Sequence, residues 1–150
     1  METAERIPYV IVDPPVGTQR LSYHLYQVLR STFTVLPLLA GADKFLHLVT
    51  NWDEYLASPV ASRLPLSPHV FMEVLGGIEI YVAILVAAVP RIGAYAAAGG
   101  FCLVAANLLL LPGHEPAAVL NLGLALGALA LGLLARSQRG PLRPRFLPPE

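Results

Sequence analysis

The sequence contains the run Val70-Phe-Met-Glu-Val-Leu-Gly-Gly-Ile-Glu-Ile-Tyr-Val-Ala-Ile-Leu-Val-Ala-Ala-Val89. About twenty apolar residues are what a helix needs to cross the hydrocarbon core of a bilayer. The only charged residues in this run are Glu73 and Glu79. A carboxylate in hydrocarbon costs roughly 2.5 kcal/mol or more, so each glutamate predicts a polar partner elsewhere in the chain.

The composition of the whole chain agrees with a membrane protein. The 150 residues are 55% hydrophobic with a mean hydropathy of +0.61, which is too apolar for an ordinary soluble domain of this size. Charged residues make up 13% and the net charge is zero, so nucleic acid is not expected as a partner. A single cysteine, Cys102, excludes an internal disulfide. We therefore expect lipids and other membrane protein subunits as partners.

Hydropathy predicts an all-α, four-transmembrane-helix antiparallel bundle. The expected spans are residues 26–50, 70–89, 92–111 and 117–135, within one domain at 21–136. Residues 1–20 contain three prolines and are expected to form an extended polar arm without a helix. Residues 137–150 are expected to form a basic, proline-rich tail. Trp52 and Tyr55 are expected to anchor the end of the first span at the headgroup level.

Positive charge predicts the orientation of this bundle. With four spans both termini lie on the same side, and two cations, Lys44 and Arg63, belong to the opposite side. The terminal side carries Arg6, Arg20, Arg91, Arg136, Arg139, Arg143 and Arg145. The excess of arginine predicts that both termini are cytoplasmic, in an integral protein of the bacterial inner membrane.

Every span offers a polar side chain at a similar depth near its non-cytoplasmic end. These residues are Asp43, Lys44, Glu73, Asn107 and Asn121. One interpretation is a structural clamp in which Lys44 neutralises Glu73, and the other is a small-molecule or headgroup pocket that opens outward. Glu79 lies roughly 9 Å deeper, near the midplane. Two explanations for Glu79 stay open, a contact with Arg30 from the cytoplasmic side or a protonated carboxyl.

Three histidines, His47, His69 and His114, map to the same non-cytoplasmic end. No two of them have the HxH or HxxxH spacing of a metal site, so they are weak metal candidates, and solvated interfacial histidines are the expected interpretation. The sequence also contains no Ser-His-Asp elbow or phosphate loop. We therefore expect no catalytic residues and no bound metal.

Several positions resemble the DoxX-like family of small four-helix membrane proteins, over about residues 26–135. The resemblance rests on Arg30, Gly41, Asp43-Lys44-Phe45, Phe71-Met-Glu73, Gly76-Gly77 and Asn121-Leu122. The chain departs from the family pattern at Asp43, where an apolar residue is more usual, and in its second acid, Glu79. The resemblance implies a subunit without a covalently bound prosthetic group that anchors a complex beside redox partners, with Lys44 and Glu73 as structural or pocket-lining residues.

Together these observations predict a non-catalytic accessory subunit of a larger membrane complex of electron-transfer type, respiratory or photosynthetic. Such a subunit could line a quinone or lipid pocket built from Asp43, Lys44, Glu73, Glu79 and the two asparagines. The alternative is a stand-alone transporter of small molecules or ions, or a lipid-binding protein, that uses Glu73 and Glu79 directly.

Overall fold

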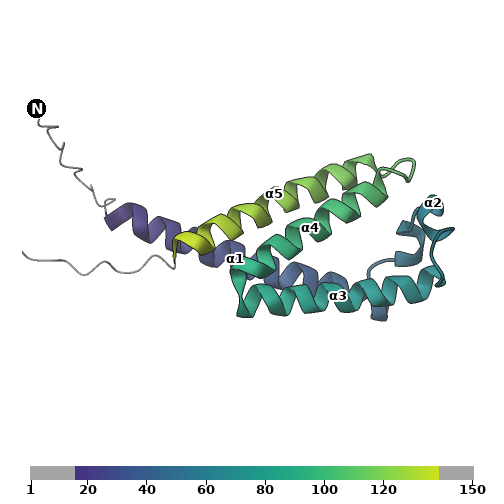
Figure 1. The fold of residues 1–150 in the computed structure, drawn as a ribbon, viewed down its shortest axis with the longest axis horizontal. Helices are drawn as coiled ribbons and strands as arrows, with labels where there is room; N and C mark the ends of the chain where they lie inside the picture. Colours follow the sequence, from purple (N-terminus) through teal and green to yellow (C-terminus); the bar gives the residue numbers. More distant parts are fainter. Residues whose placement is uncertain (1–15, 139–150) are drawn as a thin grey trace, which may run out of the picture.

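The computed structural model describes residues 16–138, which form an all-α protein as predicted (Figure 1). Three helices, α3, α4 and α5, are long and apolar enough to cross a membrane, which indicates an integral membrane protein. The elements in chain order are α1 (Val16–Leu46), the 3-10 helix η1 (Trp52–Tyr55), α2 (Ser58–Ala61), α3 (Pro68–Ala88), α4 (Pro90–Leu108) and α5 (Glu115–Ser137).

The four long helices alternate in direction, and they pack as two pairs. α1 lies along α3, and α4 lies along α5, while α3 and α4 meet mainly near the residue that joins them, Val89. Figure 1 shows that the described ends of the chain lie at one end of the bundle together with the Val89 turn, which we call the terminal end. Residues 47–67 and 109–114 lie at the other end, which we call the loop end.

The first helix differs most from its prediction. Residues 16–20, expected to belong to an extended arm, are the start of α1, because the prolines that exclude a helix all precede Val16. The helix has 31 residues, about 46 Å, and Pro37 does not interrupt it. Its first half is polar, so α1 is not among the helices that composition alone marks as membrane spans. Residues 1–15 of the expected arm, and 139–150 of the expected tail, lie outside the described part of the chain.

The predicted first span also ends too late. α1 stops at Leu46 because His47 adopts the left-handed conformation, with φ of 50°, and its N–H donates to Asp43 O at 2.8 Å. The Asp43 carboxylate then accepts hydrogen bonds from the next two backbone N–H groups, of Leu48 and Val49. A helix C-terminus has unsatisfied backbone groups, and here an aspartate within the last turn redirects the chain into a loop.

Two glycines set the separation of α1 and α3. A Cβ on Gly41 would lie 2.6 Å from the carbonyl oxygen of Gly76, and one on Gly76 would lie 2.8 Å from that of Gly41. No real side chain tolerates such distances, so the two helices touch backbone to backbone at this point. Small residues at a crossing are typical of helices that pack in membranes, where close contact replaces the hydrophobic effect as the driving force.

The larger of two apolar clusters lies toward the terminal end, where residues from all four long helices meet. Phe33 from α1 packs against Gly127 of α5, where its ring lies 3.0 Å from the position a Cβ would take, and edge-to-face on Phe101 of α4. The buried members of this core are Phe33, Val86, Ala94, Ala97, Ala98, Ala128 and Leu131. Alanine dominates on α4 and α5, so these two helices approach closely along their length.

The paired glycines of α3 provide a matched test of the α1–α3 contact. Gly76→Ala should lower the stability of the protein in detergent by about 1 to 3 kcal/mol, because its Cβ would meet Gly41 O and push the helices apart. Gly77→Ala adds the same methyl group into open space, and should leave stability unchanged or raise it by up to about 1 kcal/mol. Thermal unfolding of both variants would check this, and equal destabilisation would contradict the backbone contact.

Candidate functional site

A largely buried ion pair joins α1 to α3 beside the contact of Gly41 with Gly76. Lys44 Nζ lies 2.7 Å from Glu79 Oε2, and the two side chains are 4% and 20% exposed. Lys44 also lies 3.5 Å from the carbonyl oxygen of Ala40, one turn earlier in its own helix. The ammonium group therefore has a carboxylate and a backbone acceptor, which is the pairing that a buried charge requires.

This pair corrects the predicted clamp, in which Lys44 was expected to neutralise Glu73. The Cα–Cβ bonds of a helix tilt toward its N-terminus, and α1 and α3 run in opposite directions. Lys44 therefore points toward the terminal end and Glu79 points toward the loop end, so the two side chains meet across a difference in depth. Glu73 points toward the loop end as well and away from Lys44. Counting depth along the backbone ignored these directions.

The contact of Gly41 with Gly76 provides the space in which the side chains of Lys44 and Glu79 lie. The position of a Cβ on Gly76 would lie 3.0 Å from the Cβ of Lys44, and one on Gly41 would lie 3.1 Å from the Cβ of Glu79. Each charged side chain thus lies directly over the glycine of the opposite helix. The space that the missing Cβ atoms leave is the space that the stems of the two charged residues use.

An aromatic ring closes the ion pair on the loop side. Lys44 Nζ lies 4.0 Å from the centroid of the Trp52 ring, in a cation–π contact. The Trp52 indole N–H donates to Asp43 Oδ2 at 2.7 Å, while Asp43 Oδ1 accepts from Leu48 N at 2.9 Å and Val49 N at 3.0 Å. Asp43 therefore orients the ring that covers Lys44. The sequence predicted Trp52 as a headgroup anchor and did not predict this role.

The other members of the predicted polar layer have separate partners. Asn107 of α4 accepts from Ala57 N at 3.0 Å and donates to Tyr55 O at 2.6 Å, so it fixes the segment after η1 to α4. Asn121 of α5 donates to Ala117 O at 2.9 Å within its own helix. Asp43, Lys44 and Glu79 come together as a site, whereas Glu73, Asn107 and Asn121 do not join it.

Arg30, one of the two proposed partners of Glu79, lies elsewhere. Its guanidinium donates to Ala87 O at the terminal end of α3. It lines a shallow open groove of about 260 Å³ between α1 and α3, whose walls are Gln27, Arg30, Ser31, Thr34, Val35 and Ala87. The basic side chain satisfies a carbonyl of the last turn of α3, which is a favourable place for a cation. Of the two explanations left open for Glu79, the contact with Arg30 is not formed, because Glu79 pairs with Lys44 and Arg30 with Ala87 O.

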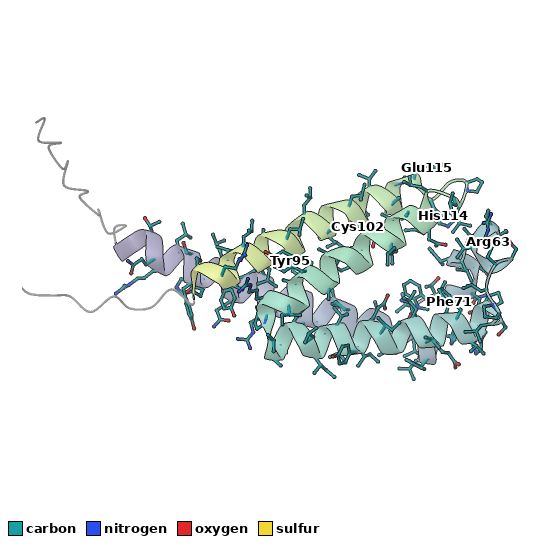
Figure 2. All side chains as sticks on the ribbon, viewed as in Figure 1. Arg63, Phe71, Tyr95, Cys102, His114 and Glu115 are labelled. Carbon is teal, nitrogen blue, oxygen red and sulfur yellow. The ribbon has the colours of Figure 1, made fainter. Side chains whose placement is uncertain are left out.

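The histidines form a cluster that the sequence only partly indicated. The rings of His47 and His69 stack at 5.3 Å with an angle of 19° between them. His69 Nδ1 lies 3.2 Å from Asp53 Oδ2, and His69 Nε2 lies 3.6 Å from Glu73 Oε1. His114 is apart from them, edge-on to Tyr55 at 5.3 Å, and Figure 2 shows it at the loop end beside Glu115. Asp53 is the carboxylate of this cluster, and the spacing of the histidines along the sequence did not indicate it.

The Lys44–Glu79 pair predicts non-additive effects of substitution. Glu79→Leu or Lys44→Met alone should lower the stability of the protein in detergent by about 3 to 5 kcal/mol, because each leaves a largely buried charge without its partner. A double Lys44→Met, Glu79→Leu variant should recover much of that loss.

Glu73→Gln serves as the control, since the ion pair of Glu73 is with the half-exposed His69 and the change should alter stability by less than about 1 kcal/mol. Thermal unfolding of all four variants measures the coupling. If the double variant lost as much as the two single variants together, the pair would not be the stabilising contact that its geometry indicates.

The two asparagines provide a second matched pair. Asn107→Leu should cost about 1 to 3 kcal/mol, because it removes the side-chain partners of Ala57 N and Tyr55 O. Asn121→Leu removes a bond only within its own helix and should be close to neutral. Hydrogen exchange should also show faster exchange of the Ala57 amide in the first variant alone, and unchanged protection there would contradict the bridging role.

Comparisons of this chain with protein-family models, with curated proteins and with solved structures return no match.

Proposed function

We propose that this protein is a non-catalytic accessory subunit of a larger complex in the bacterial inner membrane, with α1 as a fourth span and both termini cytoplasmic. The observation that supports this most is a set of outward-facing glycines on the three apolar helices. A Cβ on each would meet nothing within 4 Å, and they are Gly77, Gly99, Gly100 and Gly123. Contacts among residues 16–138 do not explain them.

A glycine in the interior of a helix costs about 1 kcal/mol relative to alanine. At Gly41 and Gly76 the cost is offset by the close contact of α1 and α3, whereas at the four outward positions the described part of the chain makes no such contact. Helices that pack in membranes use small residues to let backbones approach. The outward glycines therefore fit helices of neighbouring subunits, and the large exposed side chains around them, such as Leu103 and Leu126, fit partner helices or lipid.

The pairing of the buried charges also favours an accessory role over a transport role. Glu79 is engaged by Lys44, and Asp43 accepts three hydrogen bonds that organise the loop. A carboxylate that carries an ion or proton needs to exchange partners, while these groups serve the packing of α1 on α3. The resemblance to DoxX-like proteins extends the proposal to complexes of electron-transfer type, in which a quinone or a lipid would lie against this subunit.

The charge distribution supports the proposed orientation. Within residues 16–138 four of the five arginines, Arg20, Arg30, Arg91 and Arg136, belong to the terminal half of the bundle, and the fifth, Arg63, lies at the loop end. The acidic residues of the same range lie between the middle of the bundle and the loop end: Asp43, Asp53, Glu54, Glu73, Glu79 and Glu115. An arginine-rich end that carries no described acid is suited to the cytoplasmic face.

Purification from native membranes in a mild detergent tests the proposal. We expect other membrane proteins to co-purify in fixed ratio with this chain, identified by mass spectrometry. Gly99→Leu and Gly123→Leu should remove those partners without lowering the thermal stability of the isolated chain, because each larger side chain enters space that is open within it.

Leu126→Ile is the control, since it keeps the volume of another outward residue and should retain the partners. A monodisperse homo-oligomer without other proteins would contradict the accessory role and favour the alternative, a stand-alone transporter or lipid-binding protein. Retention of all partners by both glycine variants would contradict the glycine faces as the contact surface.

A further inference from the structure

We propose that His47, Asp53 and His69 form a binding site for a divalent transition-metal ion at the loop end. One ligand atom from each residue lies within 4.8 Å of the ligand atoms of the other two. Two imidazoles and a carboxylate are a set that zinc and its neighbours in the first transition row accept. The three residues come from separate segments, so the tertiary structure, and not sequence spacing, assembles the site.

Each ligand has a position that the backbone fixes. His47 is in the left-handed conformation directly after α1, an arrangement uncommon for a residue other than glycine. Asp53 lies in η1, where its N–H donates to the capping side chain of Asn51. His69 lies in the first turn of α3, which Ser67 caps. Of the three, His47 has the sparsely populated backbone conformation that clusters at binding sites.

The hydrogen bonds of Asp53 leave room for a cation. Asp53 Oδ2 lies 3.2 Å from His69 Nδ1. Asp53 Oδ1 is buried, and within residues 16–138 it is the only buried side-chain nitrogen or oxygen without a hydrogen-bond partner. A buried carboxylate oxygen without a partner is costly and calls for an explanation. A cation bound between Asp53 and the two imidazoles would supply the missing partner.

Glu73 completes the site from the second layer. If His69 binds the ion through Nδ1, its Nε2–H faces Glu73 Oε1, which lies 3.6 Å away. Metal-binding histidines usually donate their second ring N–H to a carboxylate or carbonyl, which fixes the tautomer and the orientation of the ring. This role explains why Glu73 belongs with the histidines and not with Lys44.

The proposed site has three protein ligands and lies at the surface. Metal–nitrogen and metal–oxygen distances of about 2.0 to 2.2 Å require the three ligand atoms to draw closer than they are now. Both histidines are exposed, so we expect rotation of their side chains to bring the ligand nitrogens closer to Asp53. Three protein ligands leave a position for water, as in open zinc sites.

Zinc binding to the full chain in detergent, purified without a histidine tag and stripped by a chelator, tests the proposal. We expect one Zn²⁺ per chain by titration calorimetry and by metal analysis after desalting. Co²⁺ should compete with Zn²⁺ for the site. Its visible absorption should be that of a cobalt ion with a low coordination number. Zn²⁺ should also raise the unfolding temperature, because it links the end of α1, η1 and α3.

His69→Ala and Asp53→Asn should each weaken Zn²⁺ binding by more than about tenfold, and Glu73→Gln by about tenfold. Two controls replace histidines outside the cluster: His114→Ala at the same end of the bundle, and His24→Ala in α1. Both variants should bind Zn²⁺ as tightly as the unchanged protein. Circular dichroism would show that each variant is folded before binding is measured.

Two results would overturn the proposal. One is Zn²⁺ binding of the same strength in His69→Ala, Asp53→Asn and the unchanged protein, which would show adventitious binding elsewhere on the chain. The other is the absence of stoichiometric binding together with an unchanged unfolding temperature. Neither result bears on the accessory role, because the glycine faces of α3, α4 and α5 do not contribute to this cluster.

Discussion

The structure depends on burying the one lysine of the chain between two helices. An ammonium group in apolar surroundings is stable only when a counter-charge and further polar contacts surround it. Lys44 obtains these from Glu79, from the carbonyl of Ala40 and from the face of Trp52. Gly41 and Gly76 allow the helices to approach closely enough for the pair to form. The position of α1 on α3 follows from this set of contacts.

The same set extends through the loop to the second helix pair. Asp43 orients Trp52, Trp52 begins η1, and the segment after η1 is held to α4 by Asn107. At the opposite end the single residue Val89 joins α3 to α4. There Gly93, which has no side chain, lets α4 contact the α3 backbone at Val86. The two helix pairs are therefore joined at both ends, by polar contacts at one and by a tight turn at the other.

The apolar helices could be predicted from sequence because hydropathy reports them directly. α3, α4 and α5 begin and end within a few residues of the predicted spans at 70–89, 92–111 and 117–135. The limits of α1 were harder to predict, because local interactions set them. The helix begins directly after a proline, and it ends where the Asp43 carboxylate accepts hydrogen bonds from the backbone N–H groups that follow. Hydropathy does not report either effect.

The candidate site was predicted in composition but not in pairing. Asp43, Lys44 and Glu79 were all identified, yet counting residues along each span placed Glu73 opposite Lys44, because depth was measured at the backbone and not at the ends of the side chains. The approach of His47 to His69 could not be found from spacing, since the path of residues 47–67, which lead from α1 to α3, depends on tertiary contacts.

The order in which the ribosome makes the two charges has a consequence for biosynthesis. Lys44 is synthesised 35 residues before Glu79, so the cation of α1 is made before its counter-charge. A helix with an unpaired lysine and a polar first half is a poor substrate for insertion alone. Under the proposed membrane arrangement α1 would therefore enter the bilayer together with α3, as a hairpin whose charges neutralise each other on the way in.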